Sequence, residues 1–246
     1  MRVHLNGDVS AEQFSALLLK IGDGEYPESE GKVAIHEGLG SIVTTIADLT
    51  ARIYPDIANI GEKSMDWLCE RAILTPKNDN AAIINDYLLK SFKGEEMNLN
   101  PPGFPAHKLF LKVGTPVMLL RNLSPPKLCN GTRLRVKTLQ RNVIEATVFT
   151  GCAKGESVFI PRIPLTPSDY PFEFKRLQFP LKVCFAMTIN KSQGQSLKVA
   201  EIDLRESCFS HGQFYVACSR VSSPSSLVIL TPEGKTTNVV YKEVLK

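Results

Sequence analysis

Small polar residues and one cation follow an apolar run at positions 181–187, and their types suit the binding of an anion. They are Thr188, Asn190, Lys191, Ser192, Gln193 and Gly194. The run predicts an internal strand of a parallel sheet, because helices cover both faces of such a strand. Where the strand turns into a short helix, backbone N–H groups and the lysine can bind a phosphate. The stretch therefore predicts an anion site.

A second stretch places a single arginine near the end of a helix. We expect a strand over 199–204, followed by a helix that Ser210 caps, with Gln213 three residues further on. Arg220 then falls near the C-terminal end of this helix, where a solvated arginine commonly complements the helix dipole. Spacing alone favours that ordinary interpretation of Arg220.

The elements around these stretches alternate between helices and strands. We expect a helix capped by Ser10, a second one with apolar residues from Ile42 to Ile53, and a third that begins after the strand 71–74. Another strand is expected over 227–230. Strands that alternate with helices predict a parallel sheet in an α/β fold.

Residues 108–164 have a different pattern, in which short strand-like runs are separated by Gly, Pro and Asn-Gly. Such runs at close spacing predict a small antiparallel barrel. We therefore expect the α/β domain over 1–106 and 167–246, with the barrel inserted over 107–166. One side of the barrel would be basic, and it would either follow a nucleic-acid backbone or simply be solvated. Its cations are Lys112, Arg121, Arg133, Arg135, Lys137 and Arg141.

The composition narrows the class of protein. The chain has 246 residues and a net charge of +4, which is compatible with a nucleic-acid partner but does not argue for one. Its six cysteines and four histidines are scattered without metal-ligand spacing, so we expect reduced thiols, an intracellular location and no metal site. No apolar run approaches about 18 residues, so we expect no membrane span.

Two segments, TINKSQGQSL around Lys191 and GQFYVACSR ending at Arg220, closely resemble the fifth and sixth motifs of Pif-type (superfamily 1B) ATP-dependent 5′-to-3′ DNA helicases. Asn190 stands where many cellular members have His, which favours the branch that Helitron transposons encode. The resemblance covers nearly the whole chain but only the C-terminal half of the motor. It implies a RecA-like second motor domain with an inserted Src-homology-three-like barrel.

The resemblance also implies roles for individual residues. In this family the first motif binds the DNA backbone, and the arginine of the second motif reaches the γ-phosphate of ATP. The residues that would contact DNA are Thr188, Lys191, Ser192, Gln193, Gly194, Thr75, Lys77 and Asn78. The residues that would contact ATP are Arg220, Gln213 and Arg2, of which Arg220 and Arg2 would be catalytic. Two alternatives remain open: the turn at Thr75 is otherwise an ordinary helix cap, and Arg2 an exposed terminal residue.

The sequence does not contain the phosphate-binding loop that an ATPase of this type needs. Its Gly-Lys-Thr at 234–236 has Ile229 where the first glycine of that loop belongs, and Gly61-Glu62-Lys63-Ser64 fails the same pattern. We therefore expect ATP and Mg²⁺ to be held mainly by a first motor domain outside this chain. No cofactor would bind tightly here, and the chain alone would be inactive.

Two functions follow from these patterns. The first is the C-terminal half of a nuclear ATP-dependent DNA helicase that acts on single-stranded DNA and duplex junctions, together with the missing N-terminal RecA-like domain. Its process would be replication, repair, telomere maintenance or Helitron transposition. The second is a non-catalytic single-stranded-DNA-binding module or an inactive transposon remnant. A DNA titration against salt and an ATPase assay would separate them.

Overall fold

The computed structural model describes residues 9–99, 109–165 and 175–245. The chain divides into two compact units, each built from separate stretches of sequence. The first unit comprises residues 1–56, 70–84 and 186–246, and the second comprises residues 57–69 and 85–185. Helix α4 (Asn78–Ser91) begins in the first unit and ends in the second.

The first unit is organised around a five-stranded sheet in which all neighbouring strands run parallel. In spatial order the strands are β14 (Ala186–Thr188), β4 (Arg71–Thr75), β15 (Val199–Asp203), β16 (Leu227–Leu230) and β3 (Ser41–Val43). The central strands β4, β15 and β16 are almost entirely buried, as their apolar runs require. The α/β class and the parallel sheet expected from the sequence are confirmed.

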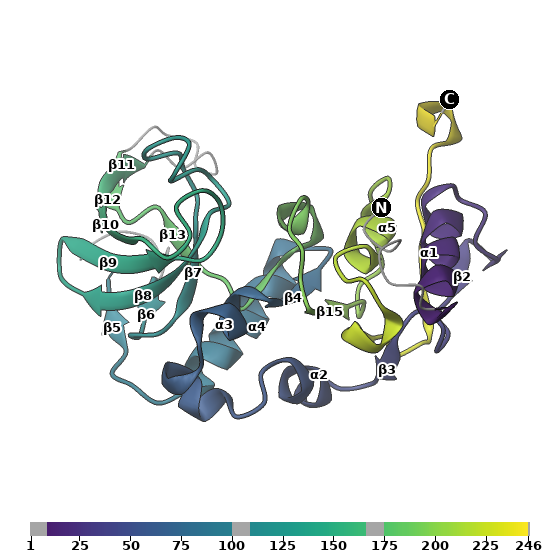
Figure 1. The fold of residues 1–246 in the computed structure, drawn as a ribbon, viewed down its shortest axis with the longest axis horizontal. Helices are drawn as coiled ribbons and strands as arrows, with labels where there is room; N and C mark the ends of the chain where they lie inside the picture. The colour runs from purple at the N-terminus through teal and green to yellow at the C-terminus, as the bar shows by residue number, and fades with distance from the viewer. Residues whose placement is uncertain (1–8, 100–108, 166–174, 246) are drawn as a thin grey trace. The chain divides into compact units, whose positions relative to one another are not determined.

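Short helices pack on this sheet. Helix α2 (Ile46–Ile53) packs against β4, β15 and β16, with Thr45 capping its first turn. Helix α5 (Gln213–Cys218) contacts the 3-10 helix η3 (Ile189–Ser192) and helix α1 (Val9–Gly22). In Figure 1, α1 lies beside α5 although the two come from opposite ends of the chain.

The Gly-Lys-Thr triplet of the sequence lies in a small antiparallel sheet of the first unit. There β17 (Lys235–Thr236) pairs with β2 (Lys32–Ala34), which pairs in turn with β1 (Glu28–Ser29). A phosphate-binding loop instead connects a strand directly to a helix. The prediction that residues 234–236 are not such a loop is confirmed.

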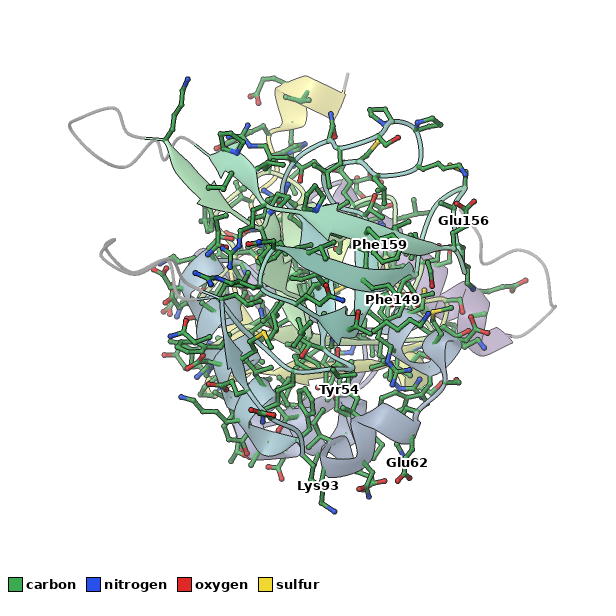
Figure 2. The ribbon with its side chains drawn as sticks, turned by 90° about the vertical axis from the view of Figure 1, so that its left-hand side faces the viewer. Tyr54, Glu62, Lys93, Phe149, Glu156 and Phe159 are labelled. Carbon is green, nitrogen blue, oxygen red and sulfur yellow. The ribbon has the colours of Figure 1, made fainter. Side chains whose placement is uncertain are left out.

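The second unit is organised around a five-stranded antiparallel sheet. In spatial order its strands are β10 (Ser157–Pro161), β9 (Val143–Val148), β8 (Arg133–Leu139), β7 (Pro116–Leu119) and β13 (Leu181–Val183). One face carries an apolar core to which Leu134, Ile144 and Ile160 contribute. The other face carries polar residues and the exposed ring of Phe159 on β10; Phe159 and Glu156, which directly precedes β10, are both labelled in Figure 2.

Shorter elements complete the second unit. They are η2 (Ile57–Glu62), α3 (Met65–Cys69), the pair β5 (Met97–Asn98) and β6 (Phe110–Leu111), and the pair β11 (Ile163–Leu165) and β12 (Arg176–Gln178). Ser64 accepts a hydrogen bond from the backbone N–H of Trp67, so the Gly61–Ser64 segment ends in a helix cap and not in a phosphate loop.

The strand expected over 181–187 is two strands. β13 belongs to the antiparallel sheet and β14 to the parallel one, and Cys184 and Phe185 between them are fully buried. The N–H of Phe185 donates to the side chain of Asn85, which satisfies the backbone at the break. The apolar run correctly predicted that these residues are buried, but it did not indicate to which sheet each half belongs.

Three helix predictions also need correction. Ile42 lies in strand β3, and the helix begins only after Thr45. The helix expected after Ser210 begins at Gln213, because Gly212 adopts a left-handed conformation with φ 65°. Ser10 lies inside α1 and not before it.

Candidate nucleic-acid interface

The two turns that were expected to contact DNA lie next to each other. Strands β14 and β4 are parallel neighbours, and their last residues, Thr188 and Thr75, are paired directly across the sheet. Parallel neighbours end at the same edge of a sheet, so the chain after Thr188 and the chain after Thr75 leave from adjacent positions. This edge therefore brings Lys191 and Lys77 into one region of the first unit.

In the turn after β14, exposed and buried side chains are clearly separated. Lys191, Gln193 and Gly194 are exposed, whereas Thr188 is 7% exposed and Ser192 is fully buried. The hydroxyl of Ser192 donates to the carbonyl of Ile189 at 2.7 Å. Ser192 and Thr188 therefore shape the turn in this structure, and the surface that a polynucleotide can reach belongs to the other three residues.

The turn after β4 shows the same separation. Thr75 is fully buried, and its hydroxyl donates to the carbonyl of Lys77. Lys77 and Asn78 are exposed, and Asn78 is the first residue of α4. The ammonium of Lys77 forms an ion pair with Glu206, which comes from the turn after β15. A phosphate at this turn would have to compete with that carboxylate.

A third cation at this edge, Arg205, was not identified from the sequence. It binds Asp203, which is the last residue of β15 and is fully buried. The guanidinium donates to both carboxylate oxygens, at 2.9 and 2.7 Å, and these hydrogen bonds raise the pKa of Arg205. An arginine two residues after a strand-ending acid was the available signal.

Arg220 lies just beyond α5 and is half-buried. Its Nε donates to the carbonyl of Val216 at 2.7 Å, and its Nη1 donates to the carbonyls of Ser192 and Gln195 at 3.2 and 3.0 Å. Its own carbonyl accepts from the N–H of Leu197, which precedes β15. The arginine of the second motif is thus bound directly to the turn of the first.

Gln213 is buried, and its side-chain amide is used internally. Its oxygen accepts from the N–H of Phe209 at 3.0 Å, and its nitrogen donates to the carbonyl of Pro76 at 3.4 Å. The amide therefore connects the chain before α5 to the turn after β4. In this structure Gln213 fixes the turn after β4 relative to the segment before α5.

A cleft of about 420 Å³ lies in the first unit along one side of Arg220. The side chains and backbone that line it come from α1, from the turn after β14 and from the end of α5. They are Leu18, Gly194, Gln195, Ser196, Leu197, Tyr215, Ser219, Arg220, Val221 and Ser222. A guanidinium beside three serine residues and a glutamine gives this cleft the chemistry of an anion site.

Three of the six cations expected on the basic side of the barrel bind backbone carbonyls of the second unit. Arg133 is 1% exposed and donates to the carbonyls of Cys69 and Leu68, and Arg135 donates to those of Lys63, Ile60 and Gly61. Lys112 is buried and donates to the carbonyl of Phe92. These three cations hold segments of the unit together and are not available to a DNA backbone. Arg121 and Arg141 are exposed, and Lys137 pairs with Glu145.

The described residues leave out one predicted site residue and bear on two further expectations, a metal site and a membrane span. Arg2 lies outside them. Within residues 9–99, 109–165 and 175–245, no group of three or more His, Cys, Asp or Glu side chains could hold a metal ion. None of the helices in the described part of the chain is long and apolar enough to cross a membrane.

Comparison with known proteins agrees with the motifs. Residues 96–139 match the model of the DNA helicase Pif1 2B domain. ATP-dependent DNA helicase PIF1 of Homo sapiens is 32% identical over 174 residues, which are 64% of this chain and 26% of that protein. ATP-dependent DNA helicase PIF6 of Trypanosoma brucei brucei is 31% identical over 140 residues, which are 54% of this chain and 18% of that protein.

Solved structures share the fold. Pif1 helicase from Candida albicans has a TM-score of 0.63 at 20% identity, over 95% of this chain and 56% of that one. Pif1 helicase from Bacteroides, in complex with ADP-AlF3 and ssDNA, has a TM-score of 0.59 at 23% identity, over 95% of this chain and 52% of that one. The chain thus corresponds to about half of each solved structure. The chain is thus similar in sequence to Pif1-type DNA helicases and shares the fold of the solved ones, and it spans only about a quarter or less of the two curated relatives described above.

Proposed function

We propose that this chain forms the C-terminal half of an ATP-dependent 5′-to-3′ DNA helicase. The observation that carries the proposal is the pairing of Thr188 with Thr75, because it brings two turns with exposed lysines to one edge of the parallel sheet. Cations and backbone N–H groups at such an edge suit the phosphates of single-stranded DNA. The names of the curated relatives and the ssDNA in a solved neighbour support the same partner.

In this proposal the residues of the edge divide into two groups. Lys191, Gln193, Gly194, Lys77 and Asn78 are exposed, and they contact the DNA backbone. The buried side chains of Thr188, Ser192 and Thr75 hold the two turns in shape. Duplex junctions would reach the same edge through their single-stranded arm.

We assign the two units to the parts of a Pif1-type motor. The unit with the parallel sheet, residues 1–56, 70–84 and 186–246, is the RecA-like second motor domain, which the sequence predicts over 1–106 and 167–246. The unit with the antiparallel sheet, residues 57–69 and 85–185, contains the inserted Src-homology-three-like barrel, which the sequence predicts over 107–166. The match of residues 96–139 to the Pif1 2B domain supports an insert in this region.

The nucleotide side of the proposal rests on Arg220. Its guanidinium lines the 420 Å³ cleft, and it would stabilise the charge that develops on the γ-phosphate. Gln213 and Arg2 are the other two residues that the family resemblance puts on the nucleotide side, Arg2 as a second cation. The sequence contains no phosphate-binding loop, so the metal and the β- and γ-phosphates would be held by the N-terminal RecA-like domain. ATP supplies the phosphoryl group whose transfer to water drives the motor.

An ATPase assay tests whether this chain supplies Arg220 to a nucleotide that another domain holds. We expect no DNA-stimulated hydrolysis by this chain alone, because the segment that holds the phosphates is supplied from elsewhere. Adding the nucleotide-binding motor domain of a Pif1-type helicase as a separate polypeptide should produce hydrolysis that an Arg220→Ala variant lowers by about 10³-fold or more. Hydrolysis by the chain alone, or a rate that does not depend on Arg220, would contradict the proposal.

A second candidate is a non-catalytic module that binds single-stranded DNA, or an inactive Helitron remnant. The combination of a DNA-binding edge with no phosphate loop in the sequence favours it. It predicts DNA binding without any hydrolysis after the motor domain is added. For the helicase, we propose a nuclear location and a role in replication, repair, recombination, telomere maintenance or Helitron transposition.

A further inference from the structure

The turn that carries Lys191 is short, so contacts from outside the turn help to decide how firmly it is held. Its 3-10 helix η3 is four residues long, and the chain then reverses at Gly194, whose φ is 81°. Within the turn, the N–H of Gln195 donates to the carbonyl of Ser192 at 2.9 Å, and the side chain of Gln195 donates to the carbonyl of Lys191 at 3.2 Å. An element this short needs further contacts to keep one conformation.

The guanidinium of Arg220 supplies such contacts. One nitrogen, Nη1, donates to the carbonyls of Ser192 and Gln195, which lie on the two sides of the reversal at Gly194. The other end of the same group is fixed to the last turn of α5, through Nε to Val216 and through Nη2 to the hydroxyl of Ser219 at 2.8 Å. The planar, rigid guanidinium therefore joins the turn to a buried helix.

We propose that Arg220 is a positioning residue for the DNA-binding turn, in addition to the phosphate role given to it above. It acts through Lys191, Gln193 and Gly194, because its hydrogen bonds fix the backbone from which these three residues project. This inference rests on the proposed function, since it assumes that the turn contacts DNA. It implies that Arg220 affects DNA binding when no nucleotide is present.

The same geometry makes the two roles of Arg220 compete. Both hydrogens of Nη1 point to carbonyls, and a phosphate in the adjacent cleft could bind this nitrogen only if Ser192 or Gln195 gave up its hydrogen bond. A charged phosphate is a stronger acceptor than a carbonyl. Anion binding through Nη1 therefore loosens the turn, and DNA binding at the turn disfavours an anion at this nitrogen by the same factor.

Single-stranded oligonucleotide binding by the isolated chain tests the positioning role, without nucleotide. We expect Arg220→Ala to weaken binding about tenfold. Arg220→Lys should not restore it, because an ammonium keeps the charge but cannot span the two carbonyls. Arg52→Ala removes an exposed arginine of α2 in the first unit and serves as the matched control, with affinity close to that of the wild type.

Two further measurements distinguish the positioning role of Arg220 from an effect of lost positive charge or of unfolding. Hydrogen exchange of a peptide covering 190–197 should speed up in Arg220→Lys while that of β16 stays slow. In a Lys191→Ala background, Arg220→Ala should cost clearly less DNA affinity than in the wild type. Wild-type affinity in Arg220→Lys with unchanged exchange, or full additivity with Lys191→Ala, would overturn the inference. If the wild-type chain binds no DNA, the proposed function fails, and the exchange data still decide whether Arg220 fixes the turn.

Discussion

Replacing Glu201 with glutamine should remove most of the pH dependence of this protein's stability between neutral pH and about pH 8, below the range in which the thiols of the unfolded chain lose their protons. Glu201 lies in the middle of β15, is fully buried, and neither of its carboxylate oxygens has a hydrogen-bond partner. Burial raises the pKa of this carboxyl group from 4.5 to about 9, an effect that the charge of Arg52 only partly opposes. The folded protein therefore holds Glu201 in its neutral form at pH 7.

The sign of the effect follows from proton linkage. Between pH 4.5 and about 9 the folded state keeps a proton that the unfolded state has released, so the free energy of unfolding falls as the pH rises. The slope for one proton is about 1.4 kcal/mol for each pH unit. The stabilisation is complete below pH 4.5 and is lost as the pH rises through about 9.

Urea unfolding at several pH values measures this slope. The free energy of unfolding of Glu201→Gln should depend less on pH than that of the wild type, and it should be higher at pH 8. Glu201→Leu should be more stable still, because it leaves no polar group unpaired. Glu25→Gln, which changes an exposed acid, is the control and should keep the wild-type slope. Equal slopes for the wild type and Glu201→Gln would show that Glu201 titrates normally in the fold.

Truncating Arg133 should destabilise the second unit strongly and leave DNA binding unchanged. Its side chain is 1% exposed, donates to the carbonyls of Cys69 and Leu68 and lies over the ring of Phe149 at 5.9 Å. Arg133→Ala removes these contacts and leaves two buried carbonyls without their donor, which should cost about 2–4 kcal/mol of unfolding free energy. Arg141→Ala, which removes an exposed arginine in the turn between β8 and β9, should cost almost nothing.

Arg133→Ala should give a different result if Arg133 instead belongs to a basic side that binds DNA. In that case Arg133→Ala would flatten the salt dependence of DNA binding while the unit stays stable. Thermal unfolding, followed by a DNA titration at a temperature where the variant is folded, distinguishes the two outcomes. A stable variant with weaker DNA binding would contradict the structural role.

The sequence predicted the parallel sheet well because its strands are short apolar runs that end in polar turns. The runs at 71–75, 199–203 and 227–230 are strands, as expected. Burial on both faces produces such runs whatever the neighbours are, so local composition is enough to find them. The position of the turn after Thr188 was predicted in the same way, from the polar residues that follow an apolar run.

Properties that depend on distant partners could not be read from the sequence. A strand with cations at every second position looks like a solvated face, and only the segment 57–69 shows that Arg133 and Arg135 are bound internally. The split of 181–187 between two sheets likewise depends on which strands lie next to each half. The bond between Arg220 and the turn joins residues 28 positions apart, and no local pattern encodes it.

The central claim is that the carboxyl edge of the parallel sheet binds the backbone of single-stranded DNA. The most direct measurement is the salt dependence of oligonucleotide binding by the wild type, by Lys191→Ala and by Lys198→Ala, a lysine that precedes β15 at the opposite end of the sheet. We predict that log affinity falls linearly with log salt, that Lys191→Ala flattens the slope by about one unit, and that Lys198→Ala leaves it unchanged. Equal slopes for all three proteins, or no binding by the wild type, would contradict the account.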